Sequence, residues 1–173
     1  MSNLLLCYLS LKSRIFSDPR NPPGTYPLKN QDKGTYLLVI EMRENQRLSV
    51  GKQSAKSFSK GIYLYVGRAK RGLQRRIERH LSKKKKNFWH IDYLLQKAEV
   101  QEVWIRRDFF DECQTALEVR NLLKDSLIPL KKFGASDCSC ASHLFYLPES
   151  KAFLKSLREK ISFEKVEIYG NQA

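Results

Sequence analysis

Alternation of apolar and polar positions predicts that the folded part of the chain begins with β-strands. Residues 34–40 (GTYLLVI) are rich in aromatic and β-branched side chains, and a polar turn at 43–46 separates them from a second short strand near 48–50. In the next strand, residues 61–67, apolar side chains alternate with tyrosines and glycines. One face of this strand can therefore be buried, while the tyrosine and glycine face is suited to contact another molecule.

A periodicity near 3.6 residues predicts helices after these strands. Residues 72–82 place Leu73, Ile77 and Leu81 on one stripe that can be buried. The remaining helices and strands are expected, in chain order, at 89–98, 100–105, 111–124, 143–147 and 150–162. The predicted fold class is α/β of the α+β kind, with a small antiparallel sheet of about three strands flanked by helices.

The same patterns divide the chain into three parts. Repeated prolines interrupt residues 1–32, which are predicted to form a loosely ordered leader. Residues 33–148 are predicted to form the folded domain, and residues 149–173 a C-terminal amphipathic helix and tail. A chain of 173 residues is long enough for one ordinary hydrophobic core.

Composition narrows the cellular setting. No apolar run approaches the roughly 18 residues that a membrane-spanning helix needs, so no membrane partner is expected. The four cysteines, Cys7, Cys113, Cys138 and Cys140, suit reduced thiols better than a disulfide framework. Both observations predict a cytoplasmic protein.

Positive charge is concentrated in one segment. The chain has 32 Lys and Arg against 18 Asp and Glu, and residues 60–90 hold eleven of these cations with one acid. Cations beside aromatic residues are typical of nucleic-acid binding, and a solvated basic helix is the alternative. The residues predicted to contact nucleic acid are Arg68, Lys70, Arg71, Arg75, Arg79, Lys83, Lys84, Lys85 and Lys86.

A helical wheel separates the arginines of residues 72–82. Arg76 lies about 60° from the buried stripe, which places it to reach over the sheet, and His80 lies about 20° from it. Arg75 and Arg79 point more nearly away, toward solvent or backbone phosphates.

Several motifs in order resemble the GIY-YIG nuclease superfamily. They are Gly34-Thr35-Tyr36, Tyr65-Val66-Gly67 and the arginine-rich helix that follows. The later blocks WHIDYLL (89–95), Glu112-Cys113 and GASDCSCASHLFY (134–146) are similar to its Uri-type endonuclease-like branch, whose members stand alone or are fused to endonuclease III. The resemblance covers residues 33 to about 146.

One literal match is misleading. Gly61-Ile62-Tyr63 spells the first motif, but only Leu64 separates it from Tyr65. Because the superfamily places its two motifs on neighbouring strands, the first motif is assigned to Gly34-Thr35-Tyr36, and Tyr63 is interpreted as a sheet residue.

The resemblance implies a metal-dependent endonuclease that hydrolyses phosphodiester bonds in DNA, with RNA left open as a substrate. Tyr36, beside Tyr65, would take part in activating water, and Arg76 would bind the scissile phosphate. Glu112 would hold one Mg²⁺ or Mn²⁺ ion, and Glu118 is its competitor. A free phenol with a pKa around 10 is a poor base at neutral pH, so Arg76 and a bound cation are expected to favour the phenolate.

Structural interpretations stand beside these roles. Tyr36 could be an ordinary strand tyrosine, and Glu112 could complement the dipole of its helix. His80 is either an accessory residue or a core histidine. His90 is either a proton shuttle or a structural residue before an apolar helix.

Cys138, Cys140 and His143 raise the question of zinc. Three soft ligands within six residues can reach one tetrahedral ion, with Cys113 or His90 as the fourth. The spacing C-x-C-x2-H is not a usual finger spacing, so packed, reduced thiols are favoured and zinc is the alternative. Asp137 is expected to cap local amides. The competing function is a nucleic-acid-binding module of the same fold that does not cleave, with or without support from zinc. A third alternative is a zinc-supported RNA-binding accessory protein.

Overall fold

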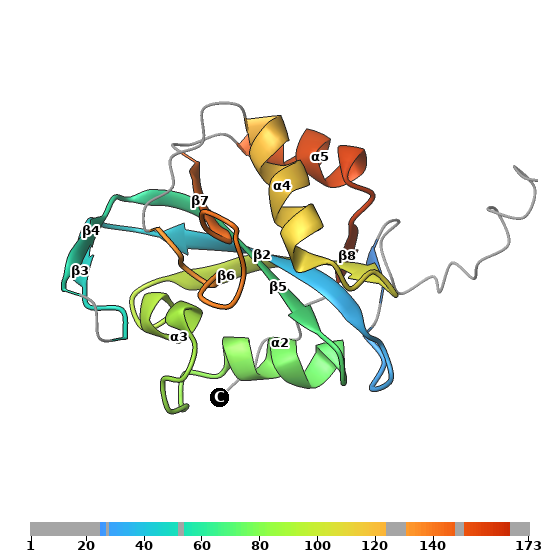
Figure 1. The fold of residues 1–173 in the computed structure, drawn as a ribbon, viewed down its shortest axis with the longest axis horizontal. Helices are drawn as coiled ribbons and strands as arrows, with labels where there is room; N and C mark the ends of the chain where they lie inside the picture. The colour runs from blue at the N-terminus through green and yellow to red at the C-terminus, as the bar shows by residue number, and fades with distance from the viewer. Residues whose placement is uncertain (1–24, 27, 52–53, 124–130, 148–150, 167–173) are drawn as a thin grey trace, which may run out of the picture.

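The computed structural model describes residues 25–26, 28–51, 54–123, 131–147 and 151–166. Within these ranges the chain is a mixed α+β structure with a six-stranded sheet, a two-stranded sheet and four helices, which confirms the predicted class (Figure 1). Most of the predicted leader and the end of the predicted tail lie outside the described residues.

The strands are β1 (Thr25–Tyr26), β2 (Gly34–Met42), β3 (Gln46–Leu48), β4 (Lys56–Phe58), β5 (Gly61–Ala69), β6 (Glu99–Arg107), β7 (Leu144–Leu147) and β8 (Glu164–Val166). The helices are α2 (Leu73–Leu81), α3 (His90–Leu94), α4 (Glu112–Leu123) and α5 (Lys151–Lys160).

The main sheet has the order β1-β8-β6-β2-β5-β7, and every pair is antiparallel except β1 with β8. The prediction of about three strands is therefore wrong. It counted the opening meander and omitted pairing between strands that are distant in the chain. β8 follows α5 and pairs with β6, and its three residues are too few to show a pattern.

The predicted meander is also wrong in its middle strand. The segment near residue 48 forms β3, which pairs with β4 in a separate hairpin. Because this insertion folds on itself, β2 pairs directly with β5, and Tyr36 lies opposite Gly67. The two assigned motifs therefore lie on neighbouring strands.

Helices cover both faces of the sheet. α2 and α3 lie on one side, and α4 and α5 on the other (Figure 1). Alternate residues of β2 enter the two cores, Tyr36 and Leu38 toward α2 and Leu37 and Val39 toward α4. A strand buried on both faces has few polar positions, which explains the nearly continuous apolar sequence of β2.

The helix predictions hold best for α2. Leu73 and Ile77 are buried and Leu81 packs against the same core, as the periodicity predicted. The helix predicted at 89–98 is wrong in length, because α3 has only five residues. The chain turns at residues 95–97, where the amides of Lys97 and Gln96 bond to the carbonyls of Leu94 and Tyr93.

Candidate active site

Tyr36 and Tyr65 lie side by side on the α2 face, with ring centroids 6.4 Å apart. The ring of Tyr36 crosses β5 at Gly67, where an added Cβ would lie 2.5 Å from the Tyr36 Oη. This close approach explains the glycine in the second motif. Tyr63 instead packs on Phe58 and Tyr146, as a sheet residue should.

His80 binds the Tyr36 hydroxyl, with Nε2 2.8 Å from Oη. The imidazole is buried, and burial followed by the charge of Lys85 lowers the pKa of His80 to about 3. The ring is therefore neutral at pH 7. Its Nδ1 makes no hydrogen bond within the described residues, but the negative charge of Asp92, with an oxygen 3.9 Å away, favours the proton on Nδ1 and a free lone pair on Nε2 facing Tyr36. His80 is thus both a core histidine and a hydrogen-bond partner of the site.

The surroundings of the two phenols do not lower their pKa values. Burial raises the pKa of Tyr36 and of Tyr65 above the ordinary value. The charge of Arg76 lowers both pKa values, as predicted, but Glu112 opposes it and burial outweighs it. The charge of Arg76 alone is therefore not enough to make either phenol a phenolate, because the rings are almost completely covered.

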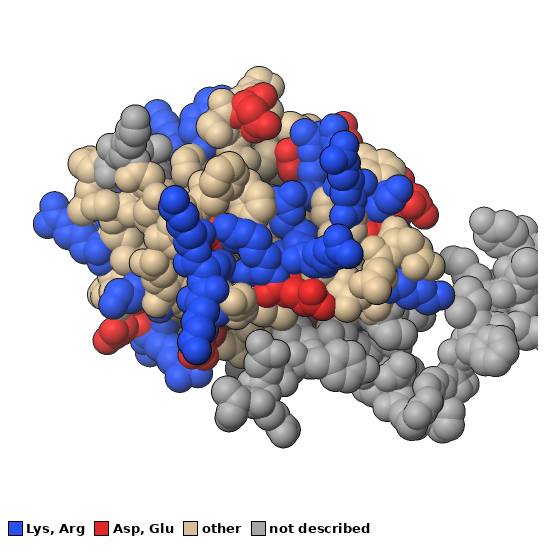
Figure 2. Space-filling model, turned by 90° about the horizontal axis from the view of Figure 1, so that it is seen from below, with Lys and Arg blue, Asp and Glu red and all other residues tan. Residues whose placement is uncertain are grey.

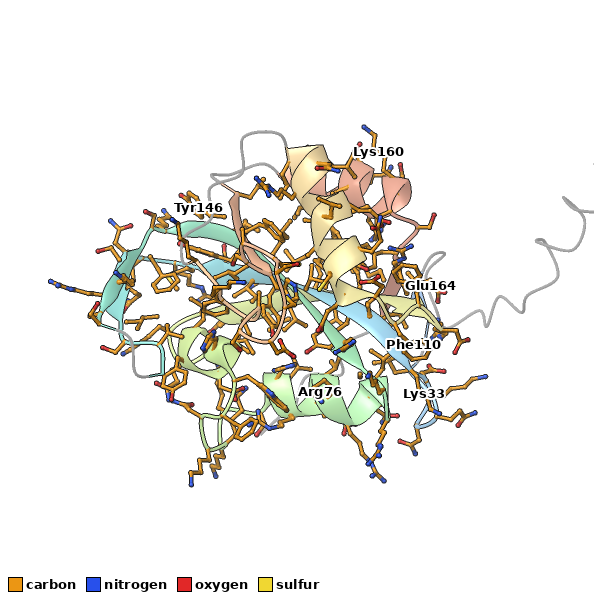
Figure 3. The ribbon with its side chains drawn as sticks, viewed as in Figure 1. Lys33, Arg76, Phe110, Tyr146, Lys160 and Glu164 are labelled. Atoms are coloured by element: carbon orange, nitrogen blue, oxygen red, sulfur yellow. The ribbon has the colours of Figure 1, made fainter. Side chains whose placement is uncertain are left out.

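Arg76 brings its charge to the two phenols of the sheet, in agreement with the helical wheel. It projects from α2 (Figure 3), and its guanidinium carbon lies 4.1 Å from the centroid of the Trp89 ring. Its charge acts on Tyr36, Tyr65 and Glu112 together. The stacking on Trp89 holds the cation beside the phenols without neutralising it.

Glu112, the first residue of α4, brings a carboxylate to the same place. Its side chain is 15% exposed, and its Oε1 lies 3.3 Å from Arg68 Nε. Burial raises the pKa of Glu112, Arg68 opposes this change, and Asp137 adds to it. Glu118 is occupied elsewhere, 2.7 Å from Arg106. Between the two glutamates, the structure groups Glu112 with the tyrosines.

Asp137 is a second acid that the sequence did not place here. Its charge acts on Glu112, Tyr65 and His143, although its own side chain is exposed. The available signal in the sequence was its position in the 134–146 block, which resembles the Uri-type branch. No local cap involving Asp137 is present among the described hydrogen bonds.

The basic residues divide into exposed and internally bound groups. Lysines and arginines gather across the face seen from the α2 side (Figure 2). The exposed members of the predicted set are Lys70, Arg71, Arg75, Lys83, Lys84 and Lys86. Arg68 is 37% exposed and paired with Glu112.

Arg79 and Lys85 were predicted to be free to contact nucleic acid, but both bind groups within the protein. Arg79 binds both carboxylate oxygens of Asp92 at 2.9 and 3.0 Å and stacks on Trp89. Lys85 donates to the His80 carbonyl at 2.5 Å and lies 3.8 Å from Asp92. The helical wheel failed for Arg79 because the chain after α2 folds back and covers that side of the helix.

Asp92 organises this turn, and sequence reasoning missed it. Its side chain is fully buried and accepts the amides of Phe88 and Trp89, each at 3.0 Å. Burial alone would raise the pKa of Asp92, but the hydrogen bonds from Arg79 and the two amides lower it below the ordinary value. The available signal was an acid three residues after Trp89, the position that caps the start of a helix.

His90 lies against the 131–143 loop. Its Nδ1 accepts the amide of Gly134 at 3.2 Å, and its ring contacts Phe133. It therefore holds the 131–143 loop rather than joining the tyrosines, and it is not the fourth member of the cysteine group.

Cys113, Cys138, Cys140 and His143 form a group that could hold a metal ion. Their ligand atoms all lie within 4.8 Å of one another, and the set would suit zinc. Burial, with the neighbouring thiols, raises the pKa of Cys113 to about 12. The thiol is therefore protonated in the metal-free protein, unlike the thiolate of a nucleophilic Cys–His pair.

Comparison with known proteins places the chain in one family. A family described as "Domain of unknown function DUF123" matches residues 35–165, and the chain belongs to it. No curated protein and no solved structure matches the chain. Within the part of the chain that the structure describes, no helix is both long enough and apolar enough to cross a membrane.

Proposed function

We propose that the protein is a metal-dependent endonuclease of the GIY-YIG type that hydrolyses phosphodiester bonds in DNA. The observation that carries the proposal is the grouping of Tyr36, Tyr65, Arg76 and Glu112. They come from β2, β5, α2 and α4, and the charges of Arg76 and Glu112 act on both phenols. A cation, a carboxylate and two phenols at one place are the groups that phosphodiester hydrolysis uses.

Arg76 is assigned to the phosphate. It is partly exposed, always charged, and fixed by stacking on Trp89 rather than by an ion pair within the described residues. A guanidinium held in this way can bind phosphate oxygens and stabilise the charge that develops on them.

Tyr36 and Tyr65 are assigned to activating the attacking water, and His80 to orienting the Tyr36 hydroxyl. Because the phenol pKa values are raised, a free phenolate is disfavoured before reaction. The His80 Nε2, 2.8 Å from the Tyr36 hydroxyl, orients this phenol, because an imidazole whose pKa is lowered to about 3 is too weak a base to take the Tyr36 proton.

Glu112 is assigned to a divalent ion, Mg²⁺ with Mn²⁺ as a substitute. A single carboxylate that is partly exposed suits an ion that keeps most of its waters. When bound, such an ion supplies charge neutralisation at the phosphate and a more acidic water.

The exposed cations of the α2 face are assigned to the nucleic-acid backbone. This interaction supplies affinity rather than sequence readout, and it suits RNA as well as DNA. A cytoplasmic location belongs to the same proposal, supported by free thiols at Cys113, Cys138 and Cys140.

A second candidate is a nucleic-acid-binding module that does not cleave. The burial of Tyr36, which is 2% exposed, favours it, because a catalytic hydroxyl must reach the water that it activates. This candidate keeps the basic face and gives Tyr36 and His80 a packing role.

A cleavage assay separates the two candidates. Pure protein is incubated with branched, nicked, flapped and single-stranded DNA, and with the RNA equivalents, with and without Mg²⁺ or Mn²⁺. We expect metal-dependent cuts that Arg76→Ala and Tyr36→Phe reduce by about a hundredfold or more. Tyr63→Phe, which alters a tyrosine of the same strand as Tyr65, is the control and should cut normally. Binding without cuts under every condition would replace the nuclease with the binding module.

A further inference from the structure

Three of the chain's four cysteines converge with one of its three histidines. Cys113 lies near the start of α4, while Cys138, Cys140 and His143 belong to the loop before β7. The fourth cysteine, Cys7, lies outside the described residues. Residues separated by a helix and a long connection have thus been brought to one point.

The distances fit a tetrahedral zinc ion. The His143 Nε2 lies 3.7 Å from the Cys138 Sγ and 3.9 Å from the Cys113 Sγ. With Zn–S bonds of about 2.3 Å and Zn–N bonds of about 2.0–2.1 Å, tetrahedral geometry separates sulfur from nitrogen by about 3.6 Å and two sulfurs by about 3.8 Å. The two observed sulfur–nitrogen separations are close to the first of these values, and every pair of ligand atoms lies within 4.8 Å.

The loop that carries three of the ligands is held in shape by its backbone. The Lys132 amide donates to the Ala141 carbonyl, and the His143 amide donates to the Phe133 carbonyl at 2.8 Å. The His143 carbonyl in turn accepts the Val66 amide of β5 at 2.9 Å. This arrangement buries His143 and fixes its backbone before any ion binds.

The same loop touches the candidate active site. A Cβ added at Gly134 would lie 2.8 Å from the Tyr65 ring, so the loop backbone packs directly on that tyrosine. On the other side, Cys113 is adjacent in sequence to Glu112. An ion at this point would therefore join the start of α4 to the loop that supports Tyr65.

We propose that Cys113, Cys138, Cys140 and His143 bind one zinc ion, which fixes the start of α4 against the 131–143 loop and so positions Glu112 beside Tyr65. The ligand set is closed, with four protein ligands and none left for water, so the ion is structural. The binding site stands on its own, whereas the positioning role rests on the proposed nuclease function.

Metal analysis of the full chain tests the site. The protein purified without chelator should contain about one zinc per chain. Replacement by Co²⁺ should give the visible bands of tetrahedral cobalt and a near-ultraviolet sulfur-to-cobalt charge-transfer band. Zinc well below one per chain, or a cobalt spectrum without the sulfur band, would show that the thiols are only packed together.

Two variants test the ligand assignment. Cys113→His keeps four ligands, so the metal content should remain while the charge-transfer band loses about a third of its intensity. Ser139→Ala changes an exposed residue between two ligands and should alter neither quantity. An unchanged band in Cys113→His would remove Cys113 from the site.

The positioning role needs a separate measurement. Cys113→Ser should raise the Mg²⁺ concentration needed for half-maximal cleavage by about tenfold or more, with DNA affinity unchanged. If Mg²⁺ dependence does not move while zinc is lost, the positioning role is wrong. If the unmodified protein binds zinc but never cuts, the nuclease proposal fails and the zinc site stands.

Discussion

Asp92 and Glu112 both act on the same pair of phenols, but their surroundings differ. Asp92 is fully buried and accepts two hydrogen bonds from Arg79 and one each from two backbone amides. Glu112 keeps part of its surface exposed, and the one ion pair described for it joins it to Arg68 at 3.3 Å.

The pKa values of the two acids shift in opposite directions for this reason. Burial is the largest influence on both, and it tends to raise the pKa. At Asp92 the hydrogen bonds reverse the effect and lower the pKa, whereas at Glu112 the charges of Arg68, Arg76 and Lys70 do not outweigh burial. Closeness to the tyrosines therefore does not identify an ion ligand. An ion ligand is identified by oxygen lone pairs that no other group uses, and Glu112 has such lone pairs.

The largest expected effect is on stability, at Asp92. Asp92→Ala leaves Arg79 without its partner and two amides without their acceptor, so the free energy of unfolding should fall by about 3–5 kcal/mol. Urea unfolding measures the change. Glu99→Ala, which breaks the exposed pair with Arg43, is the control and should cost less than about 1 kcal/mol. Equal losses of unfolding free energy in the two variants would contradict the structural role of Asp92.

A smaller effect is expected from pH, through His80. Its pKa falls from 6.5 in the unfolded chain to about 3 in the folded protein, so only the unfolded chain gains a proton between these values. Stability should therefore be complete above pH 6.5 and decline as the pH falls, by up to about 1.4 kcal/mol per pH unit from this group. The charged or titratable groups around the ring are Tyr36, Tyr65, Arg76, Arg79, Lys85 and Asp92.

His80→Gln isolates this contribution from those of the other histidines. Unfolding free energies of both proteins, measured between pH 6.5 and pH 4.5, should give a shallower slope for the variant by close to one proton. Parallel slopes would mean that His80 takes up its proton in the folded state.

The smallest expected effect is on the salt dependence of DNA binding, and it distinguishes Lys85 from its three exposed neighbours. Lys83, Lys84 and Lys86 are exposed, while the Lys85 ammonium is held by the His80 carbonyl and lies near Asp92. Replacing the three exposed lysines with glutamine should reduce the slope of log DNA affinity against log salt by up to about one unit for each lysine that binds a phosphate. Lys85→Gln, measured in the same salt series, should change the slope much less. The distinction between Lys85 and the exposed lysines is wrong if Lys85→Gln alone accounts for the change in slope.

Local patterns predicted the parts of the site that lie within one element. The stripe of Leu73 and Ile77 gave the orientation of Arg76, because a helix fixes the angle between its side chains. Motif spacing separated Tyr36 from the decoy at Tyr63, because the two assigned motifs had to lie on neighbouring strands.

Contacts between elements were not predictable in the same way. Arg79 meets Asp92 only because the chain after α2 folds back, and no periodicity reports that turn. Cys113 joins Cys138 and His143 through the placement of α4 against a loop. β8 was missed because its pairing with β6 depends on tertiary structure rather than on its own three residues.

The most direct test of the central claim is a Mg²⁺ titration of DNA cleavage at saturating protein. Glu112→Gln should keep the fold and DNA binding but reduce cleavage by about a hundredfold or more, or require much more Mg²⁺. Glu118→Gln, which changes a neighbouring glutamate of α4 paired with Arg106, should follow the unmodified protein. Normal cleavage by Glu112→Gln at the same Mg²⁺ concentration would contradict the assignment of Glu112 as the ion ligand.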